Sequence, residues 1–508
     1  MRLGTFLFED LSPEVFHESM IGERLTGRSV LTRMICELVG THHLVDEFAL
    51  FAAGDPHVPY LTCRSVDSMT SWAQRSRVVW FEPARHYWWR PALLRGSGLR
   101  FPIVSMMHSI GYSHQIGPLL TSLALGCEEG DVVISPSRAA ANVLKSHCDV
   151  LRGVLGWPLR VPAVQVVPYG VRAPIGCPGG YTVARGMLGY GEEPVIFFLG
   201  RIREDDKADF FALLESAVRW KAGGRAFRLV LAGAGTPGSD KRLLAAIRQC
   251  GLAAEAEVRL NVSEAEKAVL LRACDVFVSP SNTVSESFGL SVVEAMMHGK
   301  PVVCSNWSGY REIVRDGVDG FLVDTWWNGE DDMRLDLPFA LGLVPSMSHK
   351  VALDIAELSG AVGRLMDDPA LRRRMGENAE RRARAEFEIG VVVDEIVNVC
   401  MRSQQEYAYD SPVVAHRPCY GVASAFRAYA QHVWCAATGA ARDPFGDTLV
   451  GTGMDADYRK KDRVALDAVL GRGADSADRA AQVFRLIRKG LLRAVPQEPC
   501  DRGSVEGV

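Results

Sequence analysis

Two glutamates surround the start of an expected helix in the segment ESFGLSVVEAMMHGKPVV, residues 286–303. Apolar residues at helical spacing predict that this helix begins near Leu290 and ends at Gly299, a suitable left-handed cap. Glu286 then lies in the preceding loop and Glu294 in the second helical turn. At a rise of 1.5 Å per residue, the two acids are separated by about 12 Å. A retaining hydrolase needs about 5 Å between its carboxylates, so this pair is not expected to act on a single bond.

The two carboxylates could instead bind the two ends of one long ligand. Between them lie the backbone amides of Phe288, Gly289 and Leu290 at the expected helix start. Amides at such a position bind phosphate. An acid for a sugar hydroxyl, amides for phosphate and an acid for a ribose hydroxyl, in that order, indicate a nucleotide sugar. The alternative is an ordinary amphipathic helix that carries two surface acids.

Short apolar strands alternate with helical stretches on both sides of a Pro/Gly-rich segment at 167–180. The first set of expected strands comprises 2–8, 47–53, 77–81, 102–108, 131–135 and 164–168. The second set comprises 194–200, 228–233, 257–261, 275–281, 301–305 and 320–323. The expected helices include 29–39, 113–125, 138–150, 208–220, 240–250 and 263–273, and Ser137 is the expected N-cap of the third. Near-continuous apolar strands between helices are typical of parallel sheets covered on both faces.

The sequence therefore predicts an α/β protein with two doubly wound, Rossmann-like domains that face a cleft. We expect the first domain at 1–172 and the second at 173–395. Residues 396–508 are expected to form a crossover helix and a helical C-terminal extension, and 371–407 is a long Arg-rich helical run. Ligands of such sheets bind beyond the carboxyl ends of the strands, which places the site between the domains.

Composition excludes several classes of protein. The net charge of −4 provides no basic field for nucleic acid. No run approaches the roughly 18 apolar residues of a membrane span, and the N-terminus does not resemble a signal peptide. The 12 cysteines contain no Cys-x-x-Cys pair, which is typical of reduced thiols and indicates a cytoplasmic protein.

Several segments together resemble one known family. ESFGLSVVEAMMHGKPVV resembles the E-x7-E signature of the retaining GT-B glycosyltransferases, glycosyl transferases group 1, family 4. FFLGRIREDDKADFFALLESA and LVLAGAG resemble its strand–loop element and its Gly-rich strand end. VRLNVSEAEKAVLLRACDVFVSPS and GYREIVRDGVDGFLVD resemble the segments beside the signature. MMHSIGYSHQ and VVPYGV resemble the histidine loop and the interdomain strand. The resemblance is closest over 190–325, weaker over 100–175, weaker still before that, and absent after about 408.

A diphosphate leaving group needs cations, and Arg201 and Lys207 follow directly on an expected strand. The resemblance implies that these two side chains stabilise the departing phosphates, although their spacing of six differs from the five common in the family. It also implies that Glu286 contacts the donor sugar, that Glu294 accepts a hydrogen bond from the ribose, and that His108 faces the donor sugar.

The remaining expected donor contacts follow from the resemblance as well. Asn261 and Val262 lie where the family's backbone meets the nucleobase. Gly27 is the best match to a phosphate-approach loop, although the family's double glycine is missing. Gly233 and Gly235 are expected to serve a tight turn rather than a phosphate.

The resemblance implies a retaining, hexosyltransferase-type enzyme that uses a nucleotide-diphosphate sugar, such as a UDP-sugar, as co-substrate. It implies front-face attack, in which the leaving phosphate helps to deprotonate the acceptor, so no enzymic nucleophile is required. No metal and no cofactor are expected, because cationic side chains and helix amides replace Mg²⁺ at the diphosphate. The first domain would bind the acceptor, which could be a saccharide, a lipid-linked compound or a natural-product small molecule. Two alternatives stay open: other GT-B chemistry, such as an epimerase or phosphorylase, and a non-catalytic acceptor-binding paralogue.

Three further features are not expected to bind the donor. Asp455 and Asp457 resemble the metal-binding pair of the other glycosyltransferase fold, but they lack a preceding strand, so no metal is expected there. The aromatic and arginine-rich stretch 85–96 is expected to pack in the core, with an acceptor platform or membrane contact as alternatives. The amphipathic stretch 481–495 is expected to pack on the protein itself, with peripheral membrane contact or homo-oligomerisation as alternatives.

Overall fold

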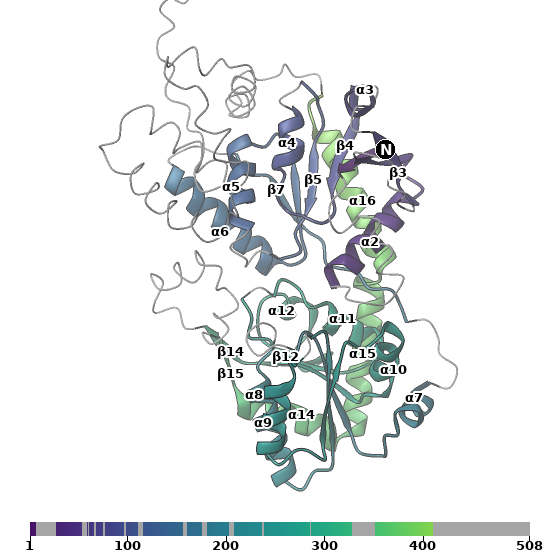
Figure 1. Cartoon of the computed structure of the whole chain (residues 1–508), viewed down its shortest axis with the longest axis vertical. Helices are drawn as coiled ribbons and strands as arrows, with labels where there is room; N and C mark the ends of the chain where they lie inside the picture. Colours follow the sequence, from purple (N-terminus) through teal and green to yellow (C-terminus); the bar gives the residue numbers. More distant parts are fainter. Residues whose placement is uncertain are drawn as a thin grey trace, which may run out of the picture.

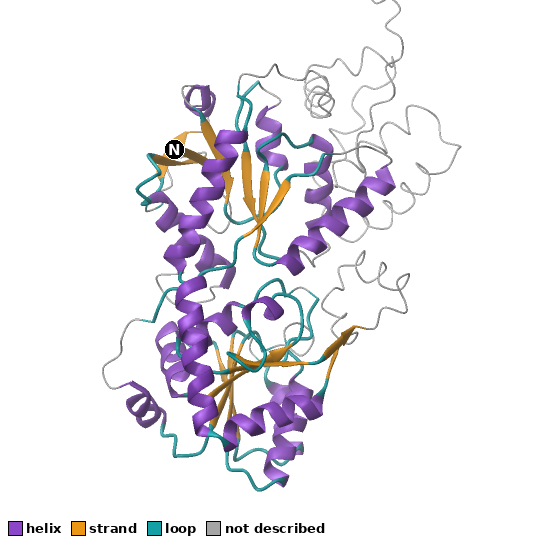
Figure 2. Ribbon diagram, turned by 180° about the vertical axis from the view of Figure 1, so that it is seen from behind, coloured by secondary structure: helices purple, strands orange, loops and turns teal. Residues whose placement is uncertain are grey.

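Two parallel sheets, one in each half of the chain, dominate the computed structural model (Figures 1 and 2). The structure describes residues 1–6, 27–52, 58, 60–65, 68–74, 77–95, 98–109, 115–155, 160–174, 180–202, 208–235, 238–284, 286–327 and 351–409. Lys207, Asp455, Asp457 and the stretch 481–495 lie outside these residues. The same holds for the expected C-terminal extension after Tyr409.

The first sheet has the strand order β3-β2-β1-β4-β5-β6-β7 among the described residues. Its strands are β1 (Arg2–Phe6), β2 (Glu47–Ala52), β3 (Thr62–Ser65), β4 (Val78–Glu82), β5 (Ile103–Met106), β6 (Val132–Ser135) and β7 (Ala163–Val166). Its helices are α2 (Gly27–Gly40), α3 (Met69–Gln74), α4 (Trp89–Arg95), α5 (Ile116–Leu125) and α6 (Arg138–Leu155). All strand pairs are parallel, and β4, β5 and β6 are buried along their whole length. Such burial explains their near-continuous apolar sequences.

The second sheet has the order β10-β9-β8-β11-β12-β13. Its strands are β8 (Val195–Leu199), β9 (Arg228–Gly233), β10 (Ala256–Leu260), β11 (Val276–Ser279), β12 (Val302–Ser305) and β13 (Gly320–Val323). Its helices are α7 (Gly180–Leu188), α8 (Phe210–Ala222), α9 (Lys241–Gln249), α10 (Glu264–Ala273), α11 (Leu290–Met297), α12 (Tyr310–Ile313), α14 (Ile355–Asp367) and α15 (Pro369–Glu386). In both sheets the chain order reverses beside the first strand, and open α/β sheets bind ligands at such a switch point.

The expected fold class is confirmed, with three differences in detail. β3 and the small antiparallel pair β14 (Thr325–Trp327) and β15 (Val351–Leu353) were not predicted. The Arg-rich run 371–407 forms two helices rather than one. The helix is interrupted between the end of α15 at Glu386 and the start of α16 (Ile389–Glu406). At the break, Phe387 O accepts from Val171 N at 2.9 Å and Ile389 N donates to Val171 O at 3.0 Å.

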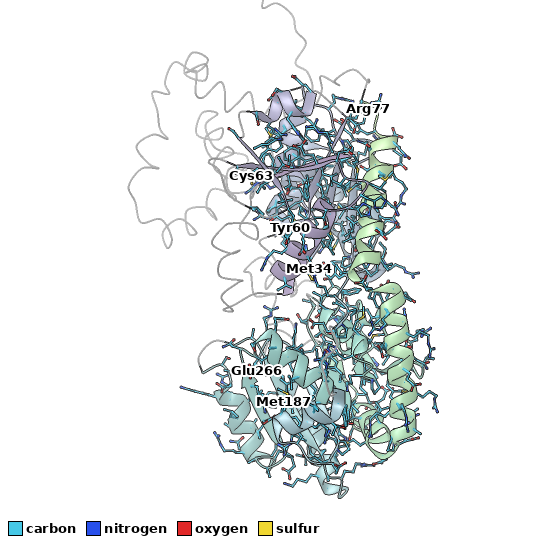
Figure 3. The ribbon with its side chains drawn as sticks, turned by 90° about the vertical axis from the view of Figure 1, so that its right-hand side faces the viewer. Met34, Tyr60, Cys63, Arg77, Met187 and Glu266 are labelled. Carbon is cyan, nitrogen blue, oxygen red and sulfur yellow. The ribbon has the colours of Figure 1, made fainter. Side chains whose placement is uncertain are left out.

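Helix α16 returns from the second half of the chain to the first. It packs against α2 and against strands β4, β5 and β6, and Figure 1 shows it in light green beside the purple α2. Figure 3 shows the same long green helices running beside both halves, with Tyr60 and Arg77 in the first half and Met187 and Glu266 in the second. The chain crosses between the halves at Val171 and again at 387–389, and these two crossing segments are hydrogen-bonded to each other.

One apolar cluster joins the two halves. It runs from the first sheet through Tyr169, Phe288 and Phe387, all buried, to the helices of the second sheet. In the expected core stretch 85–96, Trp88 is 1% exposed and Arg95 is 2% exposed, and Arg95 pairs with the buried Asp131. Core packing of these two side chains is thus confirmed. Among the described residues, no helix has both the length and the apolar character needed to cross a membrane.

Candidate functional site

The loop between β11 and α11 carries the first of the two glutamates, and the helix begins at Leu290 as predicted. Gly289 is its N-cap and has a φ of 124°. A Cβ at this position would lie 2.2 Å from Cε1 of Tyr310, so both the backbone angle and the contact require glycine. The carbonyl of Gly289 accepts from the amides of Val292 and Val293, which leaves the start of α11 well defined.

Glu286 lies beside this helix start. Its Oε1 accepts from the amide of Phe288 at 3.3 Å, and its carbonyl accepts from the hydroxyl of Ser308. One of the three amides expected to bind phosphate therefore donates to Glu286 in this structure. Burial raises the pKa of Tyr169 and Tyr310, and the negative charge of Glu286 raises both further. The carboxylate thus lies close to two buried phenols at the domain boundary.

Glu294 projects from α11 toward α10. Its Oε1 lies 2.7 Å from Nζ of Lys267, which also lies 2.7 Å from Oε2 of Glu264. Burial favours the neutral amine, but the two acids raise the pKa of Lys267 above its usual value. Glu294 is 25% exposed and Glu264 is 76% exposed, so the pair with Glu294 is the better shielded one. Lys267 was not among the site residues predicted from the sequence.

Arg201 follows directly on β8. The amides on either side of it, those of Gly200 and Ile202, donate to Ala232 O at 3.0 Å and to Ala234 O at 2.8 Å. The backbone that carries Arg201 is therefore fixed to the end of β9, and its side chain is half-buried. A Cβ on Gly233 would lie 1.6 Å from Gly200 O, which agrees with the expected backbone role of this glycine.

Asn261 adopts a positive φ of 55° at the end of β10. Its side-chain amide donates to Gly235 O at 3.0 Å, and its side-chain oxygen accepts from Gly235 N at 3.1 Å. The side chain thus braces the neighbouring glycine loop. Val262 packs partly buried against the core, and Ser263 caps α10 through a capping box with Glu266. A backbone contact with a nucleobase stays a prediction, as does the role of Gly27, the first residue of α2.

His108 follows β5 and faces the second domain. Its Nε2 lies 2.7 Å from Pro83 O, and its ring stacks on Tyr169 with centroids 5.5 Å apart. Its carbonyl accepts from the hydroxyl of Ser287 at 2.6 Å. The loops of His108 and Glu286 are therefore in direct contact, although 179 positions separate the two bonded residues. Ser287 lies inside the acidic signature but was not predicted as a site residue, because nothing in its type or spacing distinguishes it.

Arg201, Asn261 and the loop of Glu286 follow the carboxyl ends of parallel strands and therefore lie along one edge of the second sheet, whereas Gly27 lies in the first domain. β8 and β11 are neighbouring parallel strands, so Arg201 and the loop of Glu286 leave the sheet side by side. His108 meets that loop from the first domain, and Glu294 lies farther along α11. Within the described part of the chain, no three His, Cys, Asp or Glu side chains are grouped as metal ligands.

The second domain matches a known family. Residues 187–331 match the family described as Glycosyl transferases group 1. The D-inositol 3-phosphate glycosyltransferase of Segniliparus rotundus is 30% identical over 267 residues, which are 50% of this chain and 58% of the relative. The enzyme of the same name from Geodermatophilus obscurus is 39% identical over 207 residues, 39% of this chain and 44% of the relative.

A third relative is the alpha-D-kanosaminyltransferase of Streptomyces kanamyceticus. It is 25% identical over 215 residues, 42% of this chain and 47% of the relative. The aligned part of the chain therefore spans about half the length of these relatives, between 44% and 58%.

Two solved structures share the fold over most of the chain. Sucrose-phosphate synthase from Thermosynechococcus elongatus has a TM-score of 0.54 and 17% identity, covering 79% of this chain and 98% of that one. Anabaena HepE in complex with UDP also has a TM-score of 0.54 and 17% identity, covering 79% and 99%. The chain has the GT-B fold, with two Rossmann-like domains and the helix α16 that returns to the first domain, and its second domain matches the group 1 glycosyl transferases.

Proposed function

We propose that this chain is a retaining glycosyltransferase that moves a sugar from a nucleotide-diphosphate sugar to an acceptor hydroxyl. The observation that carries the proposal is the position of Arg201 and the loop of Glu286. They leave the neighbouring strands β8 and β11 at the switch point of the sheet, and the N-terminus of α11 follows that loop. A cation and a helix N-terminus suit a diphosphate. The match of residues 187–331 supports the same assignment.

In the proposed reaction, the bond between the anomeric carbon and the diphosphate oxygen breaks as the acceptor oxygen bonds to the same face. The acceptor proton passes to the leaving phosphate oxygen, so no protein nucleophile is required. Arg201 stabilises the charge that develops on the phosphates, and Lys207 is proposed as the second cation. Glu286 and His108 bind the transferred sugar, whereas Glu294 binds the ribose.

The remaining donor contacts are proposed for the backbone. The amides of Gly289 and Leu290 bind phosphate, Gly27 lets the first domain approach the donor, and Asn261 and Val262 contact the base. The complex of HepE with UDP supports a UDP-sugar as the first donor to test. The names of two relatives make D-inositol 3-phosphate the first acceptor to test, followed by saccharides, lipid-linked compounds and natural products.

The test is a donor screen that measures nucleoside diphosphate release with and without each acceptor. We expect acceptor-dependent release from one donor, and we expect proton NMR of the product to show the anomeric configuration of the donor. An inverted product would contradict retention. Donor turnover without transfer, through epimerisation or phosphorolysis, would support other GT-B chemistry. Donor or acceptor binding without any turnover would indicate a non-catalytic, acceptor-binding protein.

A further inference from the structure

The peptide segment of His108 is fixed from three directions. Met107 O accepts from the hydroxyl of Tyr169, and His108 O accepts from the hydroxyl of Ser287 at 2.6 Å. The imidazole Nε2 lies 2.7 Å from Pro83 O, and because a carbonyl can only accept, Nε2 donates. The ring of Tyr169 lies nearly parallel to the imidazole, at 27°. Both the backbone and the ring plane of His108 are thereby held.

Ser287 is the second domain's contribution to this arrangement. It is 6% exposed and lies between Glu286 and Phe288. Its hydroxyl donates to the first domain, and its carbonyl accepts from the hydroxyl of Ser137 in that domain at 2.7 Å. The Ser137 oxygen also accepts from Ala140 N at 3.0 Å, which confirms the expected N-cap of α6. The oxygen of Ser137 is oriented by the amide of Ala140, and the one proton of this hydroxyl then points to Ser287 O.

A carboxylate from the second domain strengthens the same contact. Glu312 in α12 accepts from the amides of Arg138 and Ala139, each at 3.0 Å, in the first turn of α6. A negative charge at a helix N-terminus is favourable. The residue before α12, Gly309, lies so close to Phe288 that a Cβ would be 2.6 Å from its Cα. The loop of Glu286 is therefore clamped between α12 and the first domain.

We propose that Ser287 is a positioning residue for the sugar transfer, because it fixes His108 against the loop of Glu286 only when the two domains are in contact. This inference rests on the proposed function. The hydroxyl of Ser287 links the loop of Glu286 to that of His108, and these two loops would hold the transferred sugar from opposite sides. Apart from Gly27, the groups proposed to bind the nucleotide belong to the second domain, and none of them is a partner in this hydrogen bond. Loss of the hydroxyl should therefore impair the chemical step more than donor binding.

The experiment compares Ser287→Ala with Ser287→Thr, which keeps the hydroxyl, and with Ser287→Cys, which keeps a side chain of similar size. The matched control is Ser216→Ala in α8, where another buried serine donates to Ala212 O at 2.8 Å within one helix. One net hydrogen bond corresponds to a fall in kcat of about three- to tenfold for Ser287→Ala. We expect donor KM to change less than twofold, Ser287→Thr to recover most of kcat, and the control to keep wild-type values.

A second measurement does not depend on turnover. Hydrogen exchange should become faster in Ser287→Ala in both 103–109 and 286–297, because the bond joins these segments. Faster exchange in 286–297 alone, an unchanged kcat, or a rise in donor KM without a fall in kcat would overturn the proposal. If the Ala variant does not fold, Ser287→Cys decides by the same criteria. An inactive wild-type protein would refute the proposed function, whereas an active wild-type protein with an equally active Ser287→Ala would refute only this inference.

Discussion

Nζ of Lys267 lies 2.7 Å from Oε1 of Glu294, so the acid proposed to bind the ribose already has a charged partner from the neighbouring helix. Lys267 holds the carboxylate in place through this ion pair. We expect Lys267→Met to raise donor KM by about three- to tenfold, an effect on the order of one ordinary net hydrogen bond, because Glu294 loses the partner that orients it; kcat should change less. Glu264→Gln removes the exposed partner of Lys267 and should leave both constants unchanged. Equal effects of the two variants would contradict a specific role for the pair.

Substitutions of Glu286 and Glu294 should change different kinetic constants. The ribose changes little along the reaction, so Glu294→Gln should raise donor KM more than it lowers kcat. Charge develops on the transferred sugar, so Glu286→Gln should lower kcat itself. Steady-state kinetics with circular dichroism as the folding check measure both. The same kinetic signature in the two variants would indicate that the acids are a structural pair that supports the loop and helix.

Arg201 should matter for the transition state and not for folding. Its side chain is half-buried, and the backbone on both sides of it is held by β9. By analogy with the removal of one preorganised donor, Arg201→Ala should lower kcat by about 10²–10³-fold. The thermal midpoint should stay close to that of the wild type. Arg248→Ala, an exposed arginine of α9, is the matched control. A wild-type kcat/KM in Arg201→Ala would remove this residue from the mechanism.

Activity should survive EDTA. In the proposed mechanism, cationic side chains and the amides at the start of α11 stabilise the diphosphate, which is the role that Mg²⁺ has in other transferases. The measurement is the initial rate after treatment with EDTA and gel filtration, with and without added Mg²⁺ or Mn²⁺. Complete loss of activity that only a divalent cation restores would contradict the proposed mechanism and direct attention to Asp455 and Asp457.

Gly289→Ala should destabilise the second domain and abolish donor binding. The new Cβ would lie 2.2 Å from the ring of Tyr310, which is 3% exposed and bonds to Ser279. Overpacking of this kind costs about 1–3 kcal/mol, in addition to the cost of a positive φ. Gly224→Ala is the control, because its φ is 75° and no atom lies within 4 Å of the added Cβ. Denaturant midpoints of the two variants separate the cost of the contact with Tyr310 from the cost of the positive φ. Equal losses of unfolding free energy in Gly289→Ala and Gly224→Ala would show that the contact with Tyr310 is unimportant.

The fold could be predicted because the central strands of both sheets are buried along their whole length and therefore read as apolar runs. β3 has the sequence TCRS, and none of its residues is fully buried, so it offers no such run. The break between α15 and α16 was missed because Phe387 and Glu388 do not interrupt the helical pattern. What breaks the helix is the pairing of the backbone with Val171, a contact over more than two hundred positions.

Features of the site could be predicted only where they depend on one short segment of the sequence. The start of α11 follows from local spacing, and so does the cap at Ser137. The hydrogen bond from Ser287 to His108 and the pair of Lys267 with Glu294 depend on how distant elements pack. Serine and lysine are common in loops and on helix surfaces, so their types alone do not indicate these contacts.

Glu82 gives a prediction about pH. It ends β4, is 4% exposed and accepts from Nε1 of Trp80 at 2.7 Å. Burial raises the pKa of Glu82 from 4.5 to about 7, against the opposing effects of the Trp80 hydrogen bond and of the charges of Arg85 and Arg90. Between these two values the folded protein keeps a proton that the unfolded chain has lost. The free energy of unfolding should therefore fall as the pH rises from 4.5 to about 7 and level off above it.

Glu82→Gln removes this titration. At about 1.4 kcal/mol per pKa unit, the unfolding free energy of the variant relative to the wild type should rise by on the order of 3 kcal/mol across the window. The measurement is urea unfolding at a series of pH values from 4 to 8, chosen to bracket both pKa values. Glu377→Gln, which changes an exposed glutamate of α15, should follow the wild type at every pH. A constant difference between Glu82→Gln and the wild type would show that Glu82 stays ionised when buried, held by Trp80 and the two arginines.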